Sequence, residues 1–351
     1  MSRYHSLVGV FDRLGSEYEQ VVYGHDAASG LRTIIAVFST ALGPALGGTR
    51  MWPYTTEDAA LVDVLRLGRA MAYKAAAAGL ALGGGKAVII GDPTTDKTPE
   101  RLRAYGRVVE GLGGAYITTA DVGTTVHDLD VIAETTSYVT GTSKASGDPS
   151  PTTAYGVYHG MLAVAERVFG QASLEGRHVV VTGVGKVGGA LAKLLAGAGA
   201  HVTVADIRRD VADSVAADIG ADVVEATEAA GVACDIFAPC ALGPVVTDET
   251  LDRFKCRAIA GAANNQLATP AHGRALADLG IVYAPDYVIN AGGLINVEDE
   301  LHGYDPARAR RKAEAIADTL REVFRIAADQ QIPPADAADH LAETRIRAAS
   351  R

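Results

Sequence analysis

The sequence predicts an α/β protein of two domains, in which a first domain with a mixed sheet precedes a doubly wound domain with a parallel sheet. Three observations predict this class. The chain of 351 residues is long enough for two domains with separate cores. β-rich runs alternate with helical patterns over most of its length. A glycine-rich turn at residues 183–188, between a strand and a helix, opens a series of β/α units.

Composition excludes several classes of partner. A formal net charge of −10 argues against nucleic acid, because a phosphate backbone would be repelled. The cysteine count is odd and the spacing does not suit a metal, so we expect reduced thiols and no metal site. No apolar run approaches the ~20 residues that span a bilayer, and residues 1–15 lack the apolar core of a signal peptide. We therefore expect a soluble, cytoplasmic protein that binds neither membranes nor nucleic acid.

The first elements are a hairpin, a glycine-rich loop and a helix. Runs 19–23 and 31–38 are β-rich and flank a turn signal, which predicts an antiparallel pair. Residues 42–50 read as a loop whose backbone N–H groups could face a ligand, although a simple turn explains them as well. Thr56 then begins a helix with acidic residues in its first turn, and apolar spacing continues it to Lys74.

Two lysines flank a run of small residues in the centre of the first domain. Lys74 ends the helical pattern, and the three glycines 83–85 lead into a strand over residues 87–90, with Lys86 at its mouth. Glycines let a substrate or another chain segment approach closely. In a partly dry place beside a second ammonium group, Lys86 would lose its proton readily and serve as a general base. The alternative is a glycine turn with a solvated lysine at its edge.

The remainder of the first domain alternates helix and strand. We expect a helix over 99–112, a strand over 115–119 and a helix over 126–135. Asp121 follows the strand, where it either caps the next helix or balances the charge of the two lysines and carries a proton. Residues 141–151 are polar and rich in turn formers, so they form the best linker in the chain.

A dinucleotide site is predicted at the start of the second domain. The motif G-x-G-x-x-G at 183–188 follows a strand over 177–182 and opens a helix over 187–198. The next strand, 201–205, ends in Asp206. The glycines would admit a pyrophosphate to the helix N-terminus, and the aspartate would hold the adenosine ribose hydroxyls.

The charge of Asp206 favours NAD, because a carboxylate would repel the 2′-phosphate of NADP. Arg208 and Arg209 lie close enough to weaken this preference. The residues expected to contact the dinucleotide in this region are Gly183, Gly185, Lys186, Val187, Gly188, Asp206 and Ile207.

Three later strands, 235–239, 258–260 and 281–285, end in polar or glycine-rich loops. In open parallel sheets ligands lie beyond the C-terminal strand ends. One asparagine in such a loop is explained by turn formation, but several at successive strand ends favour a binding site. The loop residues expected at the cofactor are Cys240, Ala241, Ala262, Asn264 and Asn265.

The last part of the chain is predicted to be helical. An apolar face runs through residues 313–327, Pro333 and Pro334 interrupt it, and a final helix follows over 335–349. We therefore predict a substrate-binding and oligomerisation domain at 1–145 and a dinucleotide domain at 146–330. The segment 331–351 is predicted to return to the first domain.

These motifs, in this order, resemble the Glu/Leu/Phe/Val amino acid dehydrogenases over nearly the whole chain, and most closely their leucine and valine branch. The signature around the family's catalytic lysine is matched by Leu80, Gly83, Gly84, Gly85, Lys86, Val88, Asp92 and Pro93. Further matched segments are 47–50, Lys74, 121–124, the glycine motif at 183–188, 261–265 and 290–293. The resemblance implies a substrate domain and a Rossmann-type NAD-binding domain with a cleft between them. It also implies a homo-oligomer built through the first domain.

The activity implied by the resemblance is reversible, NAD-dependent oxidative deamination of an L-amino acid to its 2-oxo acid and ammonia. Substrate carboxylate binding would fall to Lys74 and to the backbone at Gly47 and Gly48, with help from Asn290.

The catalytic roles implied by the resemblance fall on two residues. Lys86 would deprotonate the water that attacks the iminium formed by hydride transfer. Asp121 would bind the amino group and carry protons. Thr153 and Asn265 would hold the nicotinamide end of the cofactor.

The resemblance also indicates which residues line the side-chain pocket: Leu46, Thr119, Leu294 and Val297. The apolar Leu46 argues against glutamate, whose distal carboxylate would lack a partner. Thr119 is bulkier than the small residue associated with leucine- and phenylalanine-preferring relatives, which favours valine, leucine or isoleucine. The alternatives are an aromatic substrate such as phenylalanine and, in a different class, a non-catalytic NAD-binding or sensing protein.

Overall fold

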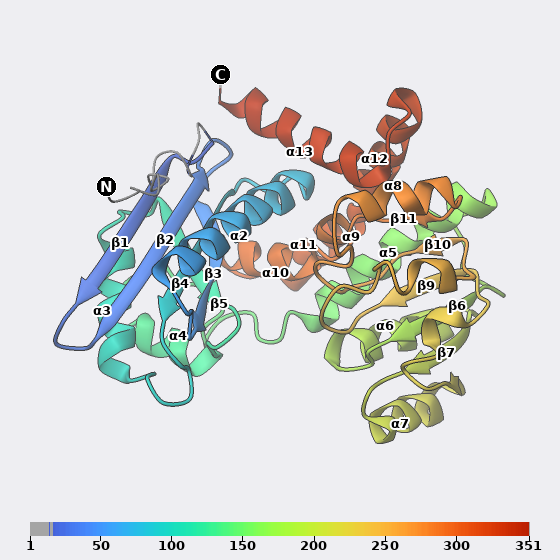
Figure 1. Cartoon of the computed structure of the whole chain (residues 1–351), viewed down its shortest axis with the longest axis horizontal. Helices are drawn as coiled ribbons and strands as arrows, with labels where there is room; N and C mark the ends of the chain where they lie inside the picture. Colours follow the sequence, from blue (N-terminus) through green and yellow to red (C-terminus); the bar gives the residue numbers. More distant parts are fainter. Residues whose placement is uncertain (1–13, 15–16, 351) are drawn as a thin grey trace, which may run out of the picture. The chain divides into compact units, whose positions relative to one another are not determined.

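The structure is a computed structural model that describes Leu14 and residues 17–350 (Figure 1). The prediction about a signal peptide falls on residues 1–15, which lie outside the described residues except for Leu14. Contacts within the chain divide it into two compact units. The first unit runs to Gly147 and also includes the segment from Arg345 onward, and the second runs from Asp148 to Thr344.

The first unit is built on a five-stranded mixed sheet with the order β1-β2-β4-β3-β5. The strands β1, β2 and β4 pair antiparallel, whereas β3 runs parallel to both β4 and β5. This confirms the predicted hairpin and the predicted mixed sheet. The strands are β1 (Gln20–Asp26), β2 (Leu31–Ser39), β3 (Ala45–Trp52), β4 (Gly83–Ile90) and β5 (Tyr116–Ala120).

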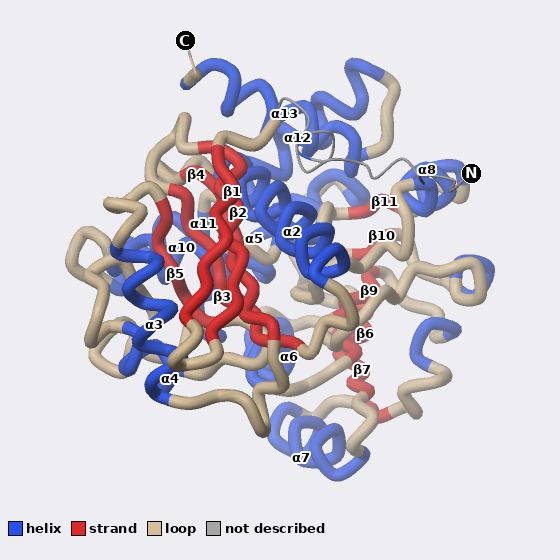
Figure 2. Tube along the Cα trace, turned by 60° about the vertical axis from the view of Figure 1, so that its left-hand side comes forward, coloured by secondary structure: helices blue, strands red, loops and turns tan. Residues whose placement is uncertain are grey.

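Helices cover both faces of this sheet, as Figure 2 shows. Helix α2 (Glu57–Ala77) packs on one face against a buried cluster that includes Ile34 and Val88. Helices α3 (Pro99–Glu110) and α4 (Val126–Ile132) cover the other face, over a second buried cluster. Each of the three helices begins after a threonine whose hydroxyl accepts a hydrogen bond from a first-turn N–H group.

The prediction of a loop over residues 42–50 is wrong from Ala45 onward. Strand β3 begins at that residue, and the first five residues of the strand are buried. Its glycines serve close strand packing rather than a turn. A Cβ on Gly47 would lie 1.8 Å from the carbonyl oxygen of Gly85 in the neighbouring strand β4. Only glycine fits that space.

The prediction that Lys86 stands at the mouth of a strand also needs correction. Strand β4 begins at Gly83, so Lys86 lies in its middle, between β2 and β3. All eight residues of β4 are buried. The glycines before Lys86 therefore belong to a central strand and not to a turn.

The second unit is built on a six-stranded sheet with the order β11-β10-β9-β6-β7-β8, and all its strands are parallel. The strand order reverses between β6 and β9, so the chain winds outward in both directions from the centre. This confirms the predicted doubly wound sheet. Its strands are β6 (His178–Thr182), β7 (His201–Ala205), β8 (Asp222–Val223), β9 (Ile236–Pro239), β10 (Ala258–Ile259) and β11 (Val282–Tyr283).

Nine α-helices are described from residue 150 onward: α5 (Ser150–Phe169), α6 (Lys186–Gly197), α7 (Arg209–Ile219), α8 (Ala271–Asp278), α9 (Asp286–Ile289), α10 (Gly292–Glu300), α11 (Pro306–Glu314), α12 (Ile316–Gln330) and α13 (Pro334–Ala349). Two 3₁₀ turns lie at Ala229–Gly231 and Leu251–Arg253. Helix α5 begins inside the predicted linker, and α9 and α10 follow strand β11 without having been predicted. Within the described part of the chain, no helix is long and apolar enough to cross a membrane.

Candidate active site

One face of the first unit's sheet carries Lys86 and several of the residues predicted at the substrate. Side chains alternate across a strand, so Lys86 points to the same face as Val88, which packs under α2. The register pairs Leu46 with Gly84 and Gly48 with Thr119, which places both pairs on this face as well. Lys74 lies in α2, the helix that covers it.

Lys86 and Asp121 form an ion pair on this face, with Lys86 Nζ 2.9 Å from Asp121 Oδ2. Only 5 % of Lys86 is exposed. Gly48 lies directly beside the pair, since a Cβ there would be 2.8 Å from the Cβ of Asp121. The hydroxyl of Thr124 accepts from the Asp121 N–H at 2.9 Å and donates to the Thr49 carbonyl at 2.7 Å, which ties the loop after β5 to β3.

Burial lowers the pKa of Lys86 below the ordinary value of lysine, despite the opposing attraction of Asp121. Burial of Asp121 acts against its ionisation, but the charges of Lys86 and Arg50 outweigh it and lower the pKa of the carboxyl. The pair thus holds an ionised carboxylate next to an amine that gives up its proton more easily than a solvated lysine. Such an amine can act as a general base, and the carboxylate can accept and pass on protons.

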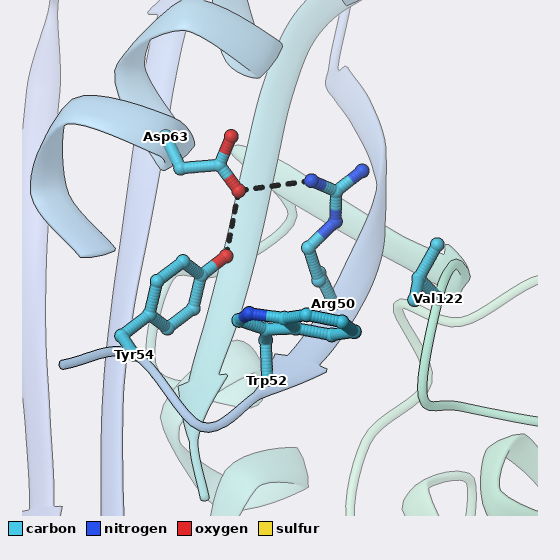
Figure 3. Close-up of a pocket in the computed structure, with 5 residues that line it drawn as sticks. All are labelled: Arg50, Trp52, Tyr54, Asp63 and Val122. Atoms are coloured by element: carbon cyan, nitrogen blue, oxygen red, sulfur yellow. Dashed lines mark hydrogen bonds and ion pairs between the residues drawn. The ribbon is translucent and has the colours of Figure 1, made fainter. Parts of the chain in front are cut away.

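Arg50 was not predicted as a site residue, yet its Nε lies 3.1 Å from the same oxygen of Asp121. Its Nη1 lies 2.9 Å from Asp63 Oδ2 in α2, and the hydroxyl of Tyr54 donates to that oxygen at 2.6 Å. Figure 3 shows Asp63 between the Tyr54 hydroxyl and the Arg50 guanidinium, with the Trp52 ring beside them.

A pocket of about 430 Å³ lies at this cluster, lined by Arg50, Trp52, Tyr54, Asp63 and Val122 (Figure 3). Trp52 is the only tryptophan of the chain. Nothing in the spacing of the sequence singles out Arg50 or Asp63. The only available signal was that Arg50 ends the matched segment 47–50.

The glycine motif of the second unit has the geometry of a dinucleotide loop. Gly183 has φ +83°, and a Cβ there would lie 2.6 Å from the Ala241 nitrogen, at the end of the neighbouring strand β9. A Cβ on Gly188 would lie 1.9 Å from the Gly183 carbonyl oxygen. Gly185, by contrast, has no atom within 4 Å of its Cβ position. The open position lies at the start of α6, where a pyrophosphate would approach the helix N-terminus.

Asp206 directly follows β7 and contacts the loop of the glycine motif. Its carboxylate accepts the N–H of Val184 at 2.9 Å and the N–H of Arg208 at 3.0 Å. Ile207 is 92 % exposed beside it, a suitable surface for an adenine ring. Lys186, on the first turn of α6 with Val187, pairs with Asp148 at 3.0 Å. These residues fit a dinucleotide.

Asn290 organises the loop after β10. Its side-chain nitrogen lies 3.1 Å from the Ala262 carbonyl, 3.3 Å from the Ala263 carbonyl and 2.8 Å from Asn264 Oδ1. Backbone carbonyls only accept, so they fix which end of the amide faces the loop. The Asn290 oxygen is buried and has no hydrogen-bond partner among the described residues. The group left for a ligand is therefore an acceptor. Asn265, the residue after Asn264 in this loop, adopts the left-handed conformation, with φ 53°.

The remaining predicted residues of the second unit lie near the start of α10. The Thr153 hydroxyl donates to the Pro149 carbonyl at 3.0 Å, and a Cβ on Gly293 would lie 3.1 Å from that hydroxyl. Leu294 and Val297 follow on α10 and lie one turn apart. Leu294 is buried, and Val297 is half-buried. Leu294 and Val297 thus share a helix, as Leu46 and Thr119 share a sheet face in the first unit.

The three cysteines are free, and burial raises the pKa of the Cys240 thiol to about 12. Among the described residues, no group of three or more His, Cys, Asp or Glu side chains could hold a metal ion.

Two family models match the chain. One, described as Glu/Leu/Phe/Val dehydrogenase, dimerisation domain, covers residues 19–138. The other, described as Glutamate/Leucine/Phenylalanine/Valine dehydrogenase, covers residues 203–349. They match the mixed-sheet unit and the later part of the chain in the expected order.

Individual relatives match almost end to end. A leucine dehydrogenase of Thermoactinomyces intermedius is 55 % identical over 96 % of this chain and 93 % of its own length. A valine dehydrogenase of Streptomyces albus is 51 % identical over 94 % of this chain and 92 % of its own. Among solved structures, an L-tryptophan dehydrogenase from Nostoc punctiforme is similar with a TM-score of 0.89 and 44 % identity, and the match covers 97 % of this chain and 98 % of that one.

Proposed function

The chain belongs to the Glu/Leu/Phe/Val dehydrogenase family, as its motifs predict, and we propose that it catalyses reversible, NAD-dependent oxidative deamination of a branched-chain L-amino acid. The observation that carries the proposal is the buried Lys86–Asp121 pair, in which the amine lies 2.9 Å from the carboxylate. A non-catalytic NAD-binding protein would have no use for a base of lowered pKa.

In the proposed reaction the amino acid, NAD⁺ and water give the 2-oxo acid, ammonium, NADH and a proton. Bound NAD⁺ supplies the acceptor for the α-hydride, which leaves an iminium on the substrate. Lys86 takes a proton from the water that attacks the iminium carbon. Asp121 holds the nitrogen and relays to it the proton that Lys86 has taken up. The C–N bond then breaks as the C=O bond forms and the hydroxyl proton passes to the Lys86 amine. Lys74 and the backbone at Gly47 and Gly48 bind the carboxylate. Asn290 was expected to assist there, but the group it leaves free is an oxygen, which can only accept a hydrogen bond, so we do not assign it to the carboxylate.

The substrate class rests on the apolar side-chain pocket. Leu46 is 1 % exposed and offers no charge to a distal carboxylate, which argues against glutamate. The family resemblance supports adding Thr119 of the first unit and Leu294 and Val297 of the second unit to the residues that would contact the side chain of leucine, valine or isoleucine. The similarity to an L-tryptophan dehydrogenase structure favours one second candidate, an aromatic amino acid.

Dehydrogenases of this family use NAD or NADP, and the choice of NAD is proposed from Asp206. Thr153 and the loops that contain Cys240, Ala241 and Asn265 complete the proposed cofactor site. A homo-oligomer formed through the first unit, which we assign as the substrate domain, is supported by the match to a dimerisation domain. A cytoplasmic location is supported by the three free cysteines.

The test is an absorbance assay for NADH formation with purified protein at mildly alkaline pH. The panel comprises L-leucine, L-valine, L-isoleucine, L-phenylalanine, L-tryptophan and L-glutamate, with the D-isomers as controls. We expect the three branched-chain amino acids to give the highest kcat/KM. A higher value for an aromatic amino acid would establish the second candidate. An inert panel would refute the enzyme assignment.

A further inference from the structure

Arg50 touches the catalytic pair without being assigned to it. We propose that Arg50 is a positioning residue that holds Asp121 against Lys86 and supplies a fixed positive charge that favours loss of the Lys86 proton. The inference rests on the proposed function, because it concerns the base of that reaction.

The geometry makes Asp121 the shared acceptor of two cations. Its Oδ2 lies 2.9 Å from Lys86 Nζ and 3.1 Å from Arg50 Nε. The three groups come from neighbouring strands, since Arg50 lies in β3, Lys86 in β4, and Asp121 directly after β5. One carboxylate oxygen held from two sides has little freedom to rotate away from the amine.

Arg50 is itself fixed from behind. Its second nitrogen, Nη1, lies 2.9 Å from Asp63 Oδ2. Asp63 also receives the Tyr54 hydroxyl on that oxygen at 2.6 Å and Arg66 on its other oxygen at 3.0 Å. The side chains of Arg50 and Asp63 are 22 % and 18 % exposed, so the clamp is largely shielded from solvent. An arginine fork that binds one carboxylate with Nε and another with Nη1 cannot be replaced by the single ammonium of lysine.

The charges around Lys86 act in opposite directions. From β3, Arg50 lowers the pKa of Lys86 in addition to the larger effect of burial. From α2, Asp63 raises it, as does Asp121 after β5. Lys74 also lies in α2, and the β2 residue paired with Lys86 is the uncharged Ala36. Loss of Arg50 should therefore make Lys86 a stronger base that stays protonated to higher pH, whereas loss of Asp63 should do the reverse.

The experiment is the pH profile of kcat/KM for L-leucine with NAD, measured on four variants of the full-length protein. Arg50→Gln removes the charge and the guanidinium fork that joins Asp121 to Asp63. Arg50→Lys keeps the charge but not the fork. Asp63→Asn removes the anion behind Arg50. Arg66→Gln is the matched control, because Arg66 is more than half exposed and binds the other oxygen of Asp63.

For Arg50→Gln we expect kcat/KM at pH 8 to fall about 10- to 100-fold, since hydrogen bonds to a charged group are lost. The acid limb of the profile should move to higher pH, so that much of the rate returns at alkaline pH. For Arg50→Lys the rate should fall while the limb moves little. For Asp63→Asn the limb should move to lower pH, and for Arg66→Gln it should stay in place.

A purely structural role would lower kcat/KM of Arg50→Gln by one factor at every pH, and that result would overturn the inference. If Arg50→Gln does not fold, the Asp63→Asn variant provides the test. An acid limb of its pH profile that stays in place or moves to higher pH would also overturn the inference. An inert wild-type protein is a different outcome, since it refutes the proposed function itself. An active wild type with unmoved limbs refutes only the role of Arg50.

Discussion

Gly84 of β4 lies so close to Ala72 of α2 that a Cβ on the glycine would stand 2.0 Å from the Ala72 backbone nitrogen. The helix that carries Lys74 and the strand that carries Lys86 therefore touch backbone to backbone. Among the three glycines before Lys86, Gly84 is the one that α2 approaches, whereas a Cβ on Gly83 would lie 1.9 Å from the Ser39 carbonyl oxygen of β2.

Gly84→Ala is expected to destabilise the protein by about 3 kcal/mol or more, because neither backbone can move away without disrupting the sheet. Urea or thermal unfolding measures the change. Gly197→Ala is the matched control, since a Cβ there meets no atom within 4 Å at the end of α6. Equal stability of the two variants would mean that the contact between α2 and β4 relaxes freely.

Lys86→Gln is expected to lower kcat by about 10²- to 10⁴-fold, the range typical for loss of a general base. Burial lowers the pKa of Lys86 from 10.5, so its amine loses the proton at a lower pH than a solvated lysine does. The wild-type deamination rate should therefore rise with pH over that lower range. The variant should lack this rise. Calorimetric titration should show unchanged NAD affinity, and a parallel loss of NAD binding would make Lys86 a structural residue.

Asp206→Ser is expected to lower kcat/KM for NAD about 10-fold or more, because the ribose loses an ionised acceptor. The Val184 N–H loses its partner as well. The ratio of kcat/KM for NADP to that for NAD should rise, since the repelling charge is gone. Asp210→Asn, on the exposed first turn of α7, serves as the control. A wild type that prefers NADP would contradict the assignment of Asp206.

Thr119→Ala is expected to raise the kcat/KM ratio of phenylalanine to valine about 10-fold, because added pocket volume changes discrimination by ~1–3 kcal/mol. Thr118→Val is the control on the same strand. Thr118 is buried on the opposite face, where its hydroxyl lies 2.6 Å from that of Thr49. That variant should lose stability but keep the substrate ratio. An unchanged ratio in Thr119→Ala would remove Thr119 from the pocket.

The second unit was the more predictable part of the chain. A G-x-G-x-x-G motif between a strand and a helix, followed by an acid at the next strand end, is a pattern that can be recognised within about 30 residues of sequence. The structure places Gly183 in a left-handed turn, Gly185 in open space and Gly188 against the Gly183 carbonyl. Helices α9 and α10 were missed because the glycines at 292 and 293 suggest a loop.

The first unit was harder to predict because its glycines are required by contacts with segments far away in the sequence. Gly47 fits against Gly85, and Gly84 fits against Ala72, and neither contact is visible from local sequence. A glycine-rich stretch therefore looked like a loop where β3 lies. Arg50 was missed for a related reason, since its partners Asp63 and Asp121 are 13 and 71 residues away.

The position of Trp52 makes the protein its own optical probe. Because the chain has a single indole, and that indole lines the pocket beside Arg50, all tryptophan emission originates next to the Arg50–Asp121 contact. Its tryptophan spectrum should follow charge changes at this one place. The Arg50 and Asp63 variants can then be compared by fluorescence before any substrate is added.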